Sequence, residues 1–158
     1  MTLRPRSPLA LGALVIVIGA GFAAYTEHVW EDYYITFRAS KHLATGEGLV
    51  FNPGERVHTF TSPLGVLLPA LTAWLVGPDE DLLALWGFRL ISLFALAGGA
   101  VFLARAAQRM GMAAVVAWLA GLLLAMDGKT LDFSINGMET GIWVLFLAYA
   151  IWAWAALN

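Results

Sequence analysis

Residues 31–63 read EDYYITFRASKHLATGEGLVFNPGERVHTFTSP and form a long polar stretch between apolar segments of the chain. The stretch begins with two adjacent carboxylates, Glu31 and Asp32, directly after an apolar segment. Leu, Ala, Val, Gly and Trp make up most of the remaining sequence. Specific chemistry in such a chain requires polar groups held at a membrane surface, and this stretch supplies them. We therefore interpret the chain as a membrane scaffold that presents a carboxylate-bearing loop.

The composition places much of the chain in a lipid bilayer. Of the 158 residues, 60% are hydrophobic and 13% are charged, and the mean hydropathy is +0.75. Soluble domains average about 45–50% apolar and about 25% charged residues. The additional apolar residues of this chain cannot all be buried in the core of a soluble domain of this size. The sequence has no basic patch of the kind that nucleic-acid binding requires. It has no cysteine, which excludes a disulfide framework and a thiolate metal site.

The apolar pattern predicts an all-α, polytopic membrane protein with one membrane domain over residues 1–158. We expect four transmembrane helices, at residues 8–25, 82–104, 109–126 and 141–157. A first loop at residues 26–81 contains two expected helices, 32–45 and 63–76, and a second loop covers residues 127–140. Two arginines precede the first apolar segment and could mark a signal peptide. That segment exceeds the roughly 7–15 apolar residues usual in signal peptides, so we favour an uncleaved helix.

The charges decide whether residues 63–76 cross the membrane. If they only lie along the surface, Arg4, Arg6, Arg105 and Arg109 share one side and all eleven acidic residues share the other. If they cross, the arginines are divided between the two sides. Cytoplasmic loops carry an excess of Lys and Arg, so the surface arrangement is favoured. Both polar loops then face away from the cytoplasm and can contact one substrate.

Two sequence blocks carry a resemblance to a known family. Residues 31–68, EDYYITFRASKHLATGEGLVFNPGERVHTFTSPLGVLL, resemble the first extracytoplasmic loop of bacterial GT-C glycosyltransferases, with the arabinofuranosyl- and mannosyltransferase-like members as the best match. Residues 136–140, NGMET, resemble the S-G-[ML]-E-T signature of the same proteins. This sequence departs from the pattern at Glu31, where aspartate is commoner, and at Asn136, where serine is usual.

The resemblance implies a multi-pass enzyme of the bacterial inner membrane with its active face on the extracytoplasmic side. Its implied partners are a polyprenyl-phosphate sugar donor, a glycan, lipid or protein acceptor, and the bilayer. Complete enzymes of this kind contain roughly seven or more spans, so we expect the chain to represent the N-terminal part of a longer enzyme or a reduced module. The family aspartate at the start of the first loop corresponds to Asp32.

The chemistry of sugar transfer then assigns candidate roles. A carboxylate beside the membrane can deprotonate an acceptor hydroxyl, and Asp32 with neighbouring Glu31 suits that role, with Glu139 as a second carboxylate. Hard oxygen ligands from Asp32 and Glu139 would suit Mg²⁺ or Mn²⁺. Candidate substrate-binding residues, among them cations for the leaving phosphate, are Arg38, Lys41, Arg89, Tyr34 and Asp132.

Ordinary structural explanations remain open for these residues. Acidic residues are favoured at helix N-termini, which applies to Glu31, Asp32 and Glu139. An arginine inside a span, such as Arg89, is often functional, but its guanidinium can also extend to the interface. Two functions therefore stay open, a lipid-linked sugar transferase and a non-catalytic membrane scaffold or partner subunit that binds lipid-linked phosphosugar.

Overall fold

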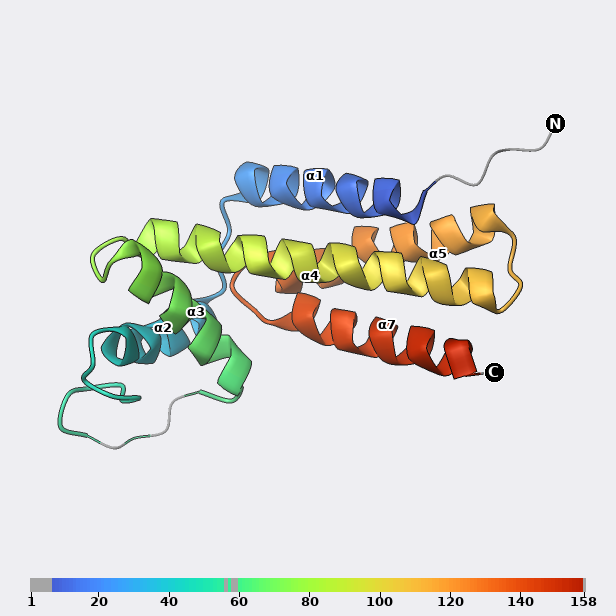
Figure 1. The fold of residues 1–158 in the computed structure, drawn as a ribbon. Helices are drawn as coiled ribbons and strands as arrows, with labels where there is room; N and C mark the ends of the chain where they lie inside the picture. The colour runs from blue at the N-terminus through green and yellow to red at the C-terminus, as the bar shows by residue number, and fades with distance from the viewer. Residues whose placement is uncertain (1–6, 56, 58–59, 158) are drawn as a thin grey trace. The chain divides into compact units, whose positions relative to one another are not determined.

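A computed structural model describes residues 7–55, 57 and 60–157, and in these residues the protein is all-α (Figure 1). Arg4, Arg6 and Arg56 lie outside the described residues. The helices are α1 (Pro8–Thr26), α2 (Glu31–Ala44), α3 (Pro63–Val76), α4 (Asp81–Arg109), α5 (Ala114–Met126), α6 (Gly128–Ile135) and α7 (Thr140–Leu157).

Three of these helices are long and apolar enough to cross a membrane, namely α1, α4 and α7. Helices α5 and α6 meet at a bend of 59° and give a fourth candidate if the bent pair is one span. The predicted fold class, a polytopic membrane protein made of helices, is therefore confirmed. Helix α3 has 14 residues and is about 21 Å long, which is short for a hydrocarbon core of about 30 Å. Its surface location stays a prediction.

One compact unit, here called the loop unit, comprises residues 28–91 and 136–139. It contains α2, α3 and the first part of α4. Its core is formed by buried aromatic and aliphatic side chains, which are Tyr33, Phe37, Ala73, Ala84, Leu85 and Phe88. The buried hydroxyl of Ser40 in α2 donates a hydrogen bond of 2.8 Å to the carbonyl of Val66 in α3. The two short helices are thereby joined by a polar contact as well as by apolar packing.

The other compact unit, here called the bundle unit, comprises residues 1–27, 92–135 and 140–158. Its helices approach closely at small residues. A Cβ on Gly99 of α4 would lie 2.9 Å from a methyl of Val144 in α7, and a Cβ on Gly121 of α5 would lie 2.8 Å from a backbone oxygen in α4. Close backbone approach at glycine is typical of helix packing in membranes. Lipid tails are as apolar as the helix surfaces, so helices associate there mainly through close packing rather than through the hydrophobic effect.

The helices of the bundle unit alternate in direction, so Arg105 and Arg109 lie at the opposite end from Glu27, Asp127 and Lys129. Helices α4 and α7 run parallel to each other and antiparallel to α1 (Figure 1). Arg105 and Arg109 lie in the last two turns of α4. Glu27 follows the end of α1 and Asp127 follows the end of α5. The membrane topology itself stays a prediction.

The larger differences from the sequence-based prediction are the end of α4, the start of α5 and the presence of α6; the other boundaries agree to within one residue. Helix α4 continues to Arg109, through residues expected to form a connector, because the ARAAQR sequence there is rich in strong helix formers. It ends before Gly111, whose φ of +79° suits glycine, and α5 begins only at Ala114. The predicted second loop contains α6, whose first turn is stabilised by the Asp127 carboxylate, which accepts 2.8 Å hydrogen bonds from the backbone N–H and hydroxyl of Thr130.

The two ends of α4 provide a test of topology. The chain has no cysteine, so single cysteines can be introduced at exposed positions beyond each end, as Asp79→Cys and Met110→Cys. We expect a membrane-impermeant thiol reagent to label the Asp79→Cys protein in intact cells and the Met110→Cys protein only after permeabilisation, because the arginine-rich end should be cytoplasmic. Labelling of the Met110→Cys protein in intact cells would show that the predicted orientation in the membrane is wrong.

Candidate functional site

The candidate site is a small cavity in the loop unit that brings both motif blocks together. It has a volume of about 140 Å³, and three segments line it: the start of α2, the residues around the start of α3, and the segment before α7. The lining residues are Asp32, Ile35, Thr36, Thr61, Ser62, Gly65, Gly137, Met138 and Glu139. We call it the carboxylate cavity, because Asp32 and Glu139, which lie 107 residues apart in sequence (139 − 32), both line it.

Asp32 is positioned by the start of α2. The helix begins at Glu31 after Trp30, whose side chain makes no capping hydrogen bond, and both acidic residues occupy its first turn. Negative charge there is favoured by the helix dipole. The backbone N–H of Trp30 donates a 2.9 Å hydrogen bond to the carbonyl of Asn136. The start of α2 is thus fixed directly to the segment that carries Glu139.

A buried arginine of α4, Arg89, also contacts the segment that precedes Glu139. Arg89 in α4 is only 3% exposed. Its guanidinium donates a 2.7 Å hydrogen bond to the carbonyl of His28 and a 3.5 Å hydrogen bond to the side-chain oxygen of Asn136. It also lies 4.9 Å from the centre of the Trp86 ring. Asn136 itself is fully buried, so the segment before Glu139 is anchored inside the loop unit.

Two glycines allow the cavity walls to approach one another. Gly137 has a φ of +107°, and a Cβ at this position would lie 2.6 Å from the Cβ of Tyr33. A Cβ on Gly65 would lie 2.9 Å from a carboxylate oxygen of Glu139. Real Cβ atoms essentially never make contacts this short. Glycine at residue 137 is therefore required by the geometry of the cavity, because both its positive φ and its contact with the Tyr33 Cβ exclude a side chain, whereas at residue 65 the flexible Glu139 side chain could shift.

Tyr33 connects the cavity wall to the core. Its ring stacks on Phe37 with the centroids 5.0 Å apart, and on Phe88 at 6.1 Å. The phenol oxygen is buried without a hydrogen-bond partner in the described part of the chain. Burial, and secondly the negative charge of Asp81, raises the pKa of this phenol. The hydroxyl therefore stays neutral, and Tyr33 acts as a packing residue beneath the carboxylates.

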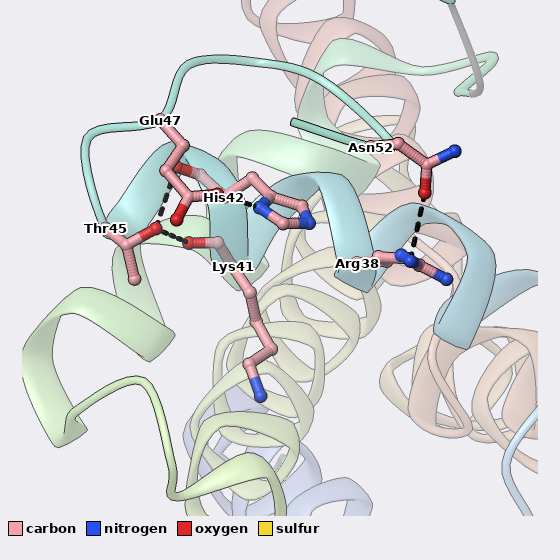
Figure 2. Close-up of polar contacts among 6 residues, drawn as sticks. All are labelled: Arg38, Lys41, His42, Thr45, Glu47 and Asn52. Carbon is pink, nitrogen blue, oxygen red and sulfur yellow. Dashed lines mark hydrogen bonds and ion pairs between the residues drawn. The ribbon is translucent and has the colours of Figure 1, made fainter. Parts of the chain in front are cut away.

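A second, more open cleft lies on another side of α2 and contains the predicted cations. We call it the cation cleft. Its lining residues are Tyr34, Phe37, Arg38, Lys41, His42, Thr45, Glu47, Pro78, Asp79 and Asp81. The Lys41 ammonium forms a 2.7 Å ion pair with Asp81. Arg38 donates a 3.0 Å hydrogen bond to Asn52 and His42 pairs with Glu47 (Figure 2). These basic groups already have polar partners within the loop unit.

The structure therefore separates the predicted site residues into groups. Asp32 and Glu139 share one cavity, whereas Tyr34, Arg38 and Lys41 line the other cleft. Arg89 lines neither and is buried against backbone and amide oxygens. Glu31 is exposed in the first turn of α2 and lines neither space. Asp132 lies on α6, in the bundle unit.

Several cavity residues were not predicted as site residues from the sequence. Thr36, Thr61, Ser62 and Met138 lie within the two motif blocks, but no role at the site was assigned to them from the sequence. Ser62 caps α3, since its hydroxyl accepts a 3.4 Å hydrogen bond from the Gly65 N–H. The available signal was the Thr-Ser-Pro sequence at residues 61–63, which places two hydroxyls directly before a proline, a residue favoured at the first position of a helix.

The cavity offers an oxygen-rich environment for a divalent cation. Its lining residues include two acidic residues, Asp32 and Glu139, and three that carry hydroxyls, Thr36, Thr61 and Ser62. The Thr36 hydroxyl donates to backbone carbonyls of α2, and the Ser62 hydroxyl accepts from the Gly65 N–H. In residues 7–55, 57 and 60–157, no group of three or more His, Cys, Asp or Glu side chains is arranged to hold a metal ion. Mg²⁺ is commonly bound by only one or two carboxylates together with water and substrate phosphates. Asp32 and Glu139 would be the protein ligands in that mode of binding, whereas the described residues form no all-protein cage.

The chain is similar to two curated enzymes. One is a "Terminal beta-(1->2)-arabinofuranosyltransferase" of Mycobacterium tuberculosis, 27% identical over 151 residues, which cover 91% of this chain and 23% of the relative. The other has the same description in Corynebacterium glutamicum and is 30% identical over 139 residues, covering 87% of this chain and 20% of the relative. The chain thus spans about a fifth to a quarter of the length of these relatives. No protein-family profile matches the chain, and no solved structure does.

The close contact at Gly137 can be tested by stability measurements. Gly137→Ala should lower the free energy of unfolding by more than Gly46→Ala. Both glycines have positive φ, at +107° and +84°, but a Cβ at residue 46 meets no atom within 4 Å. The left-handed backbone costs both variants about 1–2 kcal/mol, and overpacking against Tyr33 should add about 1–3 kcal/mol for residue 137. Thermal unfolding in detergent measures the difference, and equal losses would contradict the proposed contact.

Proposed function

We propose that the chain forms the acceptor-activating region of a membrane glycosyltransferase that uses a polyprenyl-phosphate sugar. The observation that carries the proposal is the carboxylate cavity, in which Asp32 from one motif block and Glu139 from the other line the same space. Similarity to two enzymes described as arabinofuranosyltransferases supports it. Because the chain spans only about a fifth to a quarter of those relatives, the activity is proposed for the full-length protein.

The proposed reaction is a direct displacement at the anomeric carbon. Asp32 accepts the proton of an acceptor hydroxyl, and the hydroxyl oxygen forms the new glycosidic bond. The bond between the anomeric carbon and the phosphate oxygen breaks, and the electron pair leaves with the polyprenyl phosphate. Inversion of the anomeric centre follows from a single displacement. The relatives' description suggests an arabinofuranosyl unit as the sugar, and the acceptor would be an extracytoplasmic glycan, lipid or protein.

The arrangement of charges supports distinct roles for the predicted residues. Glu139 faces the same cavity as Asp32 and would orient the acceptor or share a Mg²⁺ or Mn²⁺ ion with it. When bound, such an ion would supply positive charge for the leaving phosphate. Arg38 and Lys41 line the cation cleft and would contact substrate groups away from the reacting atoms. Arg89 would position the Asn136–Glu139 segment, since its N–H groups are directed to His28 and Asn136.

Removal of the candidate base gives a direct test. In the full-length enzyme, Asp32→Asn should lower the transfer rate by about 10²–10⁴-fold, the usual effect of losing a general base. The protein should remain folded, because the two side chains have nearly equal volumes and Asp32 is exposed. Glu139→Gln should have the next largest effect and Glu31→Gln a milder one. The measurement is transfer from a defined polyprenyl-phosphate sugar by purified protein at equal folded concentration.

Glu80→Gln provides a matched control, because it also replaces an exposed carboxylate of the loop unit by an amide but lines neither cavity. Its transfer rate should equal that of the wild type. Near wild-type rates for both Asp32→Asn and Glu139→Gln would exclude the catalytic role. They would favour the alternative of a non-catalytic scaffold or partner subunit that binds lipid-linked phosphosugar.

A further inference from the structure

A second cluster of cationic side chains lies at the far end of α4, in the bundle unit. Arg105 and Arg109 are one helical turn apart and both are exposed. With Gln108 and with Trp152 of α7 they line a surface depression of about 360 Å³. We call it the α4–α7 basic site. It plays no part in the transfer chemistry proposed for the loop unit.

The positive charge of this site is not balanced within the described chain. Neither arginine takes part in an ion pair or hydrogen bond with another described residue. The acidic residues that follow α1 and α5 lie at the opposite end of the bundle unit (Figure 1). Each guanidinium carries five N–H donors and is always charged. Two such groups four residues apart therefore form a site for an anion rather than for a cation or a neutral group.

Aromatic residues hold one of the guanidinium groups in place. The Arg109 guanidinium carbon lies 4.7 Å from the centre of the Trp152 ring. Trp152 in turn packs against Phe102 and Tyr149, with ring centroids 5.3 Å and 5.7 Å apart. A guanidinium stacked on an aromatic face keeps its planar edge available, and that edge matches two oxygens of a phosphate. The stacking thus orders the donors before an anion arrives.

The position of the two arginines along α4 indicates which kind of anion they would meet. With 29 residues, α4 is about 44 Å long, which exceeds the hydrocarbon thickness of about 30 Å. Its last turn should therefore reach the level of the lipid headgroups. Tryptophan is enriched at the same level, and Trp152 lies beside Arg109. Phosphate groups at this depth belong to phospholipids, and the uncompensated charge favours a lipid without an ammonium group.

We propose that Arg105, Arg109 and Trp152 bind the headgroup phosphate of an anionic phospholipid. The two guanidinium groups contact the phosphate oxygens, and the aromatic cluster of Phe102, Tyr149 and Trp152 lies against the adjoining lipid. Lipid bound in this way links the ends of α4 and α7 at the membrane surface.

The test is a lipid titration of the full chain in detergent, followed by native mass spectrometry with phosphatidylglycerol and phosphatidylcholine as probes. The wild type should bind phosphatidylglycerol more tightly than phosphatidylcholine. Arg109→Gln should weaken phosphatidylglycerol binding about fivefold, and the double variant Arg105→Gln/Arg109→Gln about 30-fold, since each basic residue near an anionic surface contributes roughly fivefold. Trp152→Leu should weaken it as well, because the stacked guanidinium is released.

Lys129→Gln is the matched control, since it removes one exposed positive charge elsewhere in the bundle unit and should leave binding unchanged. Arg109→Lys keeps the charge and the fold but lacks the planar arrangement of N–H donors. Weaker binding in this variant therefore supports the site even if the double variant fails to fold. Unchanged binding in both Arg109→Lys and Arg109→Gln would overturn the proposal. Equal weakening by Lys129→Gln would also overturn it, as would displacement of the lipid by an equimolar amount of inorganic phosphate.

Discussion

The candidate site depends on the hydrogen bonding of one buried cation. A guanidinium taken out of water must be surrounded by hydrogen-bond acceptors, because an unsatisfied buried charge is very costly. The acceptors of Arg89 include the His28 carbonyl and the Asn136 side chain, which lie 108 residues apart in sequence (136 − 28). Satisfying this single group therefore places the segment before α7 beside the start of α2. Glu139 reaches the carboxylate cavity as a consequence.

Close approach of backbone to side chains then sets the dimensions of the cavity. At Gly137 the backbone lies against Tyr33, which the aromatic core of the loop unit holds in place. At Gly65 the start of α3 lies against the Glu139 carboxylate. Both contacts involve elements packed in the core, and sites supported by such elements keep their geometry better than sites on free loops. The walls of the cavity are accordingly held by packing, and Asp32 at its edge is exposed.

Helix α2 carries acidic and basic side chains that line two different spaces. Asp32 and Thr36, one helical turn apart, line the carboxylate cavity, whereas Arg38 and Lys41 line the cation cleft. Ion pairing with Asp81 and hydrogen bonding to Asn52 hold those cations in place. Asp32, the proposed base, therefore lines a different space from these two cations.

The sequence by itself determined the fold class and the approximate positions of the helices, because apolar runs and helix-capping patterns are local properties of the chain. The resemblance of its motifs led to the prediction of Asp32 and Glu139 as site residues. The sequence could not determine that α4 continues through Arg109 or that α6 interrupts the second loop, since capping by Asp127 and helix propensity compete there with the polar composition. The sequence suggested Arg89 as a phosphate ligand, and the tertiary structure adds that its guanidinium donates to the His28 carbonyl and the Asn136 side chain. Only the tertiary structure decided which polar groups share a cavity. Contacts between residues about a hundred positions apart depend on which acceptors a buried charge finds and on where glycine lets two segments approach.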